Sequence, residues 1–66
     1  MDDCNRHIKQ ALRIAGRLSV LADLGEANAK DDSCSVMYGI IRDCAYRIRK
    51  QAEAEKDAHI RKGIWT

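Results

Sequence analysis

The chain contains 66 residues, of which 12 are Lys or Arg, 10 are Asp or Glu and three are Cys, and it has neither Pro nor Phe. This length allows a single domain over residues 1–66, and three cysteines cannot all pair within one chain, which argues against a disulfide scaffold. No apolar run approaches the roughly 20 residues of a membrane span, and the acidic pair Asp2 and Asp3 is unlike the basic start of a signal peptide. We therefore expect a cytoplasmic protein, and its net charge of +2 is too small to indicate nucleic-acid binding by itself.

The first predicted element is a helix over about residues 3–24. Asp2 or Asp3 can cap its N-terminus, and Gly25 stands where a glycine often ends a helix. Apolar side chains recur every three or four residues, which places them on one broad face. This face comprises Cys4, Ile8, Ala11, Leu12, Ile14, Ala15, Leu18, Leu21 and Ala22. It spans about half of the circumference, so one neighbouring helix cannot cover it.

A polar connector over about residues 25–32 precedes a second, longer helix over about residues 33–62, for which Asp32 or Ser33 is the expected cap. One seam of this helix follows a 3-4-3-4 spacing and consists of Cys34, Met37, Ile41, Cys44 and Ile48. The same register continues through Gln51, Glu55 and Ala58, so the seam becomes polar towards its C-terminal end. Gly63 is expected to end the helix in a Schellman motif, which leaves a short C-terminal tail over residues 63–66.

These elements predict an all-α fold in which two antiparallel helices form a hairpin. The second helix is expected to extend past the first by two or three turns. The broad face of the first helix predicts that a second copy covers it, so that the hairpin dimerises into a four-helix bundle. In length and in this expected architecture the chain resembles the Rop family of plasmid RNA-binding regulators, which are short helical hairpins that dimerise. The likeness is one of fold and rests on no shared residue motif.

The three cysteines are expected to pack as small hydrophobic side chains, because unpaired cysteine is among the most buried residue types. Cys44 lies in the middle of the predicted seam, so we expect it to be buried. Cys34 falls in the first turn of the second helix, where the alternative is a thiol activated by the helix dipole. No C-x-x-C pair indicates a redox or zinc site.

Both histidines follow an acidic residue at a spacing of four, which places Asp3 with His7 and Glu55 with His59 on one helix face. The ordinary interpretation is a hydrogen bond or an ion pair on the helix surface. The alternative is a metal-holding bundle through His7, Glu55 and His59, although this set lacks a complete complement of ligands. We expect no cofactor.

A basic stripe runs along the first helix on the side opposite its apolar face and consists of Arg6, Lys9, Arg13 and Arg17. On the second helix, Arg42, Tyr46 and Arg49 line the side opposite the seam. Arginines with an aromatic side chain among them can follow a phosphate backbone, so nucleic-acid binding is an alternative function. We favour the competing interpretation, a solvated outer face that keeps a dimer in solution.

Four residues are candidate contacts for a partner: Gly39, Tyr46, Ile64 and Trp65. Gly39 falls on the polar side of the second helix, where the missing side chain lets another backbone or a ligand approach. Trp65 lies beyond the predicted helix end, and tryptophan is a frequent interface anchor. It either folds back over the hairpin or docks on a partner.

The chain shows no set of nucleophile, base and orienting residue and no glycine-rich phosphate loop, so we expect no enzymatic activity. The leading hypothesis is a small cytoplasmic helical interaction module that is homodimeric and binds another protein. A nucleic-acid-binding regulator and a metal-holding bundle are the alternatives.

Overall fold

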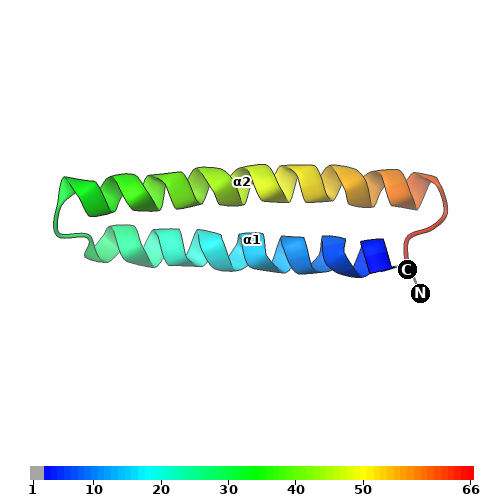
Figure 1. The fold of residues 1–66 in the computed structure, drawn as a ribbon, viewed down its shortest axis with the longest axis horizontal. Coiled ribbons are helices and arrows are strands. Elements are labelled where there is room, and N and C mark those ends of the chain that lie inside the picture. The colour runs from blue at the N-terminus through cyan, green and yellow to red at the C-terminus, as the bar shows by residue number, and fades with distance from the viewer. Residues whose placement is uncertain (1–2) are drawn as a thin grey trace.

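A computed structural model describes residues 3–66 and contains two helices, α1 (Asp3–Asn28) and α2 (Asp32–Arg61), with no strand among these residues. The helices lie antiparallel and side by side, and the tail after α2 turns back towards the start of α1 (Figure 1). The hairpin measures 48 × 16 × 13 Å between its outermost Cα atoms. This architecture confirms the predicted all-α hairpin. Neither of the two described helices is long and apolar enough to cross a membrane.

The end of α1 differs from the prediction, because the helix continues through Gly25 to Asn28. The ring of Tyr38 from α2 lies directly against Gly25, in the space that a Cβ atom at this position would occupy. Gly25 therefore permits a close contact between the helices and is not a C-terminal cap. The connector shrinks to residues 29–31. Since α1 is longer than predicted, α2 does not overhang it by two or three turns.

Both ends of α2 follow from local backbone chemistry. Asp31, one residue before the predicted caps, caps the N-terminus, and its side chain accepts a hydrogen bond of 2.8 Å from the backbone N–H of Cys34. Gly63 adopts a φ of 75°, which is left-handed and suits glycine. The backbone N–H of Ile64 donates to the carbonyl of His59 at 3.0 Å, and that of Gly63 donates to Ile60 at 3.0 Å. This pair of bonds confirms the predicted Schellman ending.

The start of α1 is described from Asp3, which is already helical. The alternative cap Asp2 lies outside the described residues.

Four alanines form the centre of the contact between the helices: Ala15 and Ala22 of α1, and Ala45 and Ala52 of α2. Each pair is seven residues apart, which is two helical turns. Small side chains at a contact let two helix axes approach, because the side chains between the axes set their distance. Ile8 is the one large hydrophobic side chain that is buried among the described residues. The hairpin therefore has a thin core.

The predicted seam of α2 is rotated relative to this alanine contact. Ile41 and Ile48 are half-buried, whereas Met37 remains 48% exposed and Cys44 is exposed. The expected burial of Cys44 is therefore wrong for the hairpin. Periodicity gives most weight to large apolar side chains, but the closest helix contact goes to the smallest ones.

The other two cysteines also lie outside the buried core, because Cys4 is exposed and Cys34 is half-buried.

Candidate functional site

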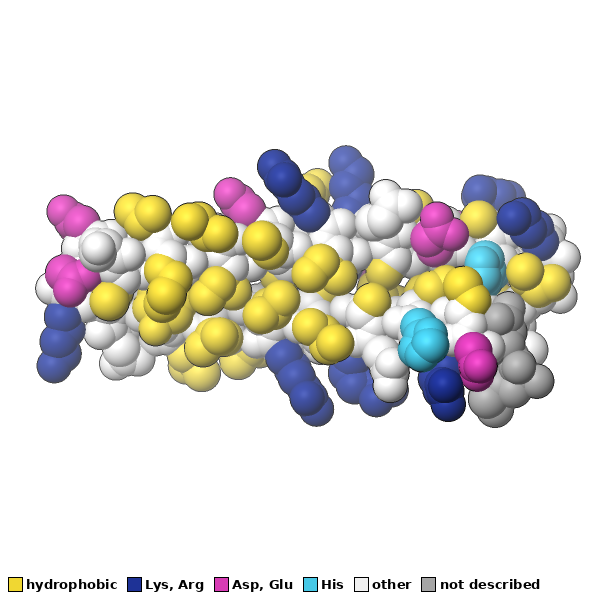
Figure 2. Space-filling model, viewed as in Figure 1, with side chains coloured by type: hydrophobic (Ala, Val, Ile, Leu, Met, Phe, Trp, Pro, Cys, Tyr) yellow, Lys and Arg dark blue, Asp and Glu magenta, His cyan; other side chains and the backbone are white. Residues whose placement is uncertain are grey.

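One broad side of the hairpin carries hydrophobic side chains along both helices. Figure 2 shows them as a band between margins of Lys and Arg. The band follows a spacing of three or four residues and includes Ala11, Ile14, Leu18 and Leu21 of α1 with Met37, Ile41, Cys44 and Ile48 of α2. We refer to these residues as the apolar face. Ile14 and Leu21 are 52% and 47% exposed, so the hairpin leaves a large part of this face in contact with solvent.

Towards the chain termini the apolar face continues into a groove between the helices. The groove has a volume of about 790 Å³ and is lined by Cys4, His7, Ile8, Ala11, Arg47, Ile48, Gln51, Ala52 and Glu55. Ala11 and Ile48 belong to both surfaces and make them continuous. We refer to the groove as the terminal groove. Its polar side chains are His7, Arg47, Gln51 and Glu55, whereas the half of the face near the connector is apolar.

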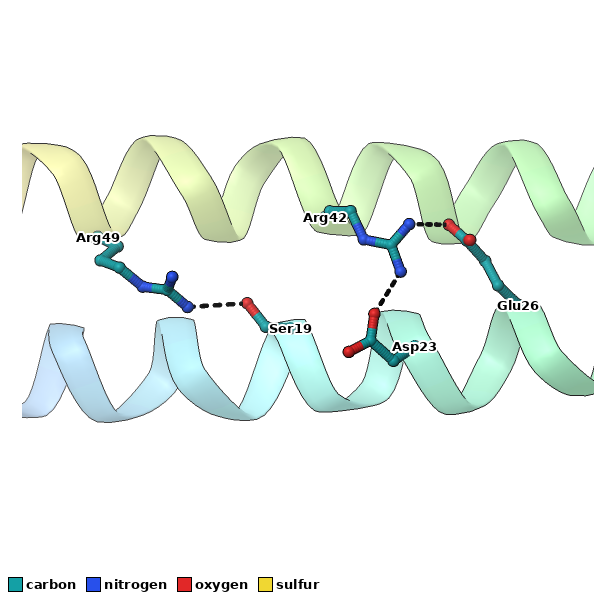
Figure 3. A network of polar contacts seen from close by, with 5 residues as sticks. All are labelled: Ser19, Asp23, Glu26, Arg42 and Arg49. Atoms are coloured by element: carbon teal, nitrogen blue, oxygen red, sulfur yellow. Dashed lines mark hydrogen bonds and ion pairs between the residues drawn. The ribbon is translucent and has the colours of Figure 1, made fainter.

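The opposite side of the hairpin is closed by polar contacts between the helices (Figure 3). Arg42 of α2 bonds to Asp23 at 2.5 Å and to Glu26 at 2.7 Å, both in α1. The hydrogen bonds that the Arg42 guanidinium donates, first to Glu26 and then to Asp23, raise its pKa above the ordinary value. Arg49 donates to the hydroxyl of Ser19 at 3.1 Å. We refer to this surface as the polar side.

A buried polar pair ties the two helices together at the terminal end. Asn5 is 1% exposed and His59 is 8% exposed, and Nδ1 of His59 hydrogen-bonds to Oδ1 of Asn5. The amide of Asn5 also donates to the carbonyl of Ile64 at 2.6 Å. Because the Asn5 amide nitrogen donates there, its oxygen accepts, and Nδ1 of His59 carries the shared proton.

The tail is fixed by further contacts to both helices. Lys9 donates to the carbonyl of Thr66 at 2.6 Å. The ring of Trp65 has the ammonium groups of Lys9 and Lys56 at 5.2 and 5.3 Å from its centre, which is cation–π geometry. Trp65 therefore folds back on the hairpin. We refer to the Asn5–His59 pair together with this tail as the terminal clasp.

The sequence analysis missed Asn5, although its position carries a signal. Asn5 lies three residues before Ile8, and His59 lies seven residues after Ala52, so both continue the lines of buried residues. A polar residue on such a line predicts a buried hydrogen bond, because buried polar groups are nearly always paired.

The proposed metal ligands are not brought together. His59 is buried and bonded to Asn5, whereas His7 and Glu55 line the terminal groove. Within residues 3–66 no group of three or more His, Cys, Asp or Glu side chains is arranged to hold a metal ion. The metal-holding alternative therefore gains no support from the arrangement of His7, Glu55 and His59 within one hairpin.

The basic residues of α1 do not form one uninterrupted stripe. Arg6 pairs with Asp3 at 3.3 Å, and Lys9 contacts the tail. Arg13 and Arg17 line a shallow depression with Gln10 and Ile14, and among the described residues neither arginine has an ion-pair partner.

On α2, Arg42 and Arg49 reach across to α1 on the polar side. Tyr46 is 62% exposed, and the ammonium of Lys50 lies 5.9 Å from the centre of its ring. The seven residues of the nucleic-acid alternative are therefore divided between two surfaces.

The remaining partner candidates differ in accessibility. A Cβ atom at Gly39 would meet no atom within 4 Å, so this glycine borders open space. Ile64 is 44% exposed, and its carbonyl is bonded to Asn5. Trp65 is half-buried in the terminal clasp.

Comparisons with known proteins found no significant match to this chain among protein-family models, curated proteins or solved structures.

Proposed function

We propose that this chain is a non-enzymatic, cytoplasmic helical interaction module that forms a homodimer through its apolar face and acts by binding another protein. The observation that carries this proposal is the exposure of large hydrophobic side chains along one side of both helices. Contiguous apolar surface of this extent marks an interaction site in soluble proteins. A dimer formed face to face would be a four-helix bundle.

The surface area of the hairpin supports a partner on this face. The hairpin exposes 5010 Å², whereas a compact monomer of 7.5 kDa exposes about 4,250 Å² by the usual size scaling. The outline of the broad side, 48 × 16 Å, corresponds to roughly 770 Å², which is close to the ~800 Å² that each partner of a stable complex buries. A second copy offers a surface of the same length, width and apolar character.

The thin core also supports dimerisation. Below about 70–80 residues, one hydrophobic core rarely supplies more than a few kcal/mol of net stability. The buried hydrophobic residues of this hairpin are four alanines and Ile8, and alanine contributes little apolar area. Covering Ile14, Leu21 and Met37 with a second copy would add the larger apolar contacts that the hairpin lacks.

Binding of a further protein would use surfaces that the dimer leaves open. Tyr46 is exposed, and Gly39 lies two turns before it on the same helix with open space beside it. An exposed aromatic side chain is a common anchor of protein interfaces. Gly39 and Tyr46 are therefore the residues that we expect this partner to contact.

Leu21→Glu tests the homodimer, with Val20→Glu as the matched control. Leu21 lies on the apolar face, and Val20, which is 57% exposed, is its chain neighbour outside that face. In the dimer, Leu21→Glu would bury an unpaired carboxylate, so we expect the dissociation constant to rise roughly 100-fold or more. Val20→Glu should change the dissociation constant by less than about twofold, because a charge on the exposed surface interacts only weakly with other groups. Sedimentation equilibrium measures both constants, and a monomeric parent protein at micromolar concentration would contradict the proposal.

Nucleic-acid binding is the second candidate. It is supported by Arg13 and Arg17, which lie one turn apart on α1 and have no ion-pair partner among residues 3–66. If it holds, affinity should fall steeply with salt, because each neutralised phosphate releases counterions. Changing both arginines to Gln should flatten the salt dependence by about one unit for each lost contact and leave the fold intact. An electrophoretic shift assay measures this, and no shift with cellular RNA or duplex DNA at physiological salt would remove this candidate.

A further inference from the structure

We infer that the two copies pair with their connectors at the same end of the bundle, so that His7 of each copy faces Glu55 of the other. This inference rests on the proposed homodimer and adds its orientation. The two terminal grooves would then form one shared site in the half of the bundle that contains the chain termini.

The first step is the uneven chemistry of the face that the copies share. Near the connector the face consists of Leu21, Met37, Ile41 and Cys44, which are apolar or weakly polar. Near the termini the groove is lined by the polar side chains of His7, Arg47, Gln51 and Glu55. Figure 2 shows the same gradient, with hydrophobic side chains over most of the length and the histidines at the end where the chain terminates.

The second step is the choice between two symmetric arrangements. A two-fold axis along the length of the bundle puts both connectors at one end and places α1 of each copy over α2 of the other at the same level. A two-fold axis across the bundle puts the connectors at opposite ends and places α1 over α1 and α2 over α2. Both are closed, self-complementary dimers, so symmetry alone does not decide between them.

Register and charge favour the first arrangement. His7 and Glu55 line the same groove from α1 and α2, so they lie at a similar level along the hairpin. With the axis along the bundle, the His7 side chain of each copy comes to lie over Glu55 of the second copy, and the apolar halves meet each other. The dimer then contains two such contacts, each a hydrogen bond or an ion pair that offsets the desolvation of the carboxylate.

The second arrangement has an electrostatic penalty. It places the groove of one copy over the connector half of the other, so that Glu55 faces the side chains of Ile41 and Cys44. The hydrogen bond of 3.4 Å that Glu55 accepts from Gln51 of the same helix offsets only part of the cost of moving its carboxylate from water to apolar surroundings. It also leaves part of the apolar face against the polar groove rim, which lowers the apolar area buried by each copy.

Distance measurements between spin labels on the full chain decide the orientation. A clickable unnatural residue at Lys30 in the connector carries the label and leaves all three cysteines in place. With the connectors together, the label distance should be about 30 Å or less, because a four-helix bundle is about two helix diameters across. With the connectors apart, the distance should be of the order of the 48 Å length of the hairpin, and that result would overturn the inference.

A label at Arg17, near the middle of α1, is the matched control. Both arrangements bring the two Arg17 positions within the width of the bundle, so a short distance there reports the dimer itself. A short Arg17 distance with a long Lys30 distance would refute the orientation and leave the homodimer standing. No dipolar coupling at Arg17 would refute the homodimer, and the inference with it, and would leave the apolar face to a different protein.

Glu55→Gln gives a second test, because the two arrangements predict opposite changes in the dimer dissociation constant. With the connectors together it removes two carboxylates that face His7, so the dimer dissociation constant should rise roughly 2- to 30-fold, the range for two partly exposed ion pairs. With the connectors apart it relieves a carboxylate that faces apolar side chains, so the dimer should become tighter. Glu53→Gln, an exposed carboxylate outside the groove, should leave the constant unchanged.

Discussion

The two sides of the hairpin close the gap between α1 and α2 in different ways. On the polar side, Arg42 and Arg49 reach across the gap and bond to Asp23, Glu26 and Ser19. On the other side, apolar side chains of both helices flank the gap, and Ile14, Leu21 and Met37 among them remain about half exposed. A side whose polar groups satisfy each other needs no partner, whereas an exposed apolar side gains free energy when it is covered. This asymmetry between the two sides is the reason why we assign the proposed dimer contact to the apolar face.

The largest effect is expected from a change at the alanine contact that both sides share. Ala45→Leu adds three carbon atoms at a position with 0% exposure, so the helices must move apart and every contact across the gap is weakened. We expect a loss of about 3 kcal/mol in the free energy of unfolding. Ala54→Leu, an exposed position of the same helix, should change it by less than about 0.5 kcal/mol. Chemical denaturation of both variants measures the difference, and equal stabilities would mean that the alanines are not the contact.

Asn5→Ala tests whether the terminal clasp, and not the terminal groove beside it, holds the two helices together near the chain termini. The change leaves Nδ1 of His59 and the carbonyl of Ile64 without their buried partner. We expect a loss of about 2 kcal/mol, since an unsatisfied buried polar group costs about 1–3 kcal/mol. Tryptophan fluorescence should also report release of Trp65 from its site between Lys9 and Lys56. A variant with parental stability and an unchanged spectrum would contradict the clasp.

Alanine substitutions at two glycines should have opposite effects on the stability of the hairpin. At Gly25, a Cβ atom would occupy the space of the Tyr38 ring, so Gly25→Ala should destabilise the hairpin by about 1–2 kcal/mol. At Gly39, a Cβ atom would meet nothing within 4 Å, so Gly39→Ala should stabilise α2 by about 0.5–1 kcal/mol through helix propensity. Thermal melts compare the two variants. Destabilisation by Gly39→Ala would contradict the open surroundings of this glycine.

The smallest effect is expected on the polar side. Arg42→Gln removes the bonds to Asp23 and Glu26, but these groups are exposed, and salt and water screen their attraction. We expect a small decrease in melting temperature that disappears at high salt, and no change in the dimer dissociation constant. A weaker dimer in Arg42→Gln would mean that the polar side takes part in the interface, which would reverse the assignment of the two sides.

Several features of the fold could be predicted from the sequence because their causes are local. Apolar periodicity of three and four residues predicts two helices, and a short polar segment between them predicts a hairpin. Gly63 predicts the end of α2, because a left-handed residue after a helix favours glycine through backbone sterics alone. The exposed position of Tyr46 also agrees with its place opposite the apolar seam.

Other features depend on which residues of the two helices meet. Gly25 has the signature of a helix end, but the ring of Tyr38, 13 positions further along the chain, makes it an interior contact. Cys44 is apolar by periodicity, yet Ala45 beside it has 0% exposure and Cys44 is exposed. The pairing of Asn5 with His59 likewise joins the two ends of the chain.

The sequence by itself determined the two helices, the end of α2 and the presence of an apolar face on each helix. Only the tertiary structure decided which part of that surface the hairpin covers itself. The physical reason is that periodicity reflects all the apolar contacts of a helix together. Which side of the helix faces one particular neighbour depends instead on how closely the two backbones can pack. Here the alanines take that closest contact, so the larger side chains of the apolar face remain available to a second copy.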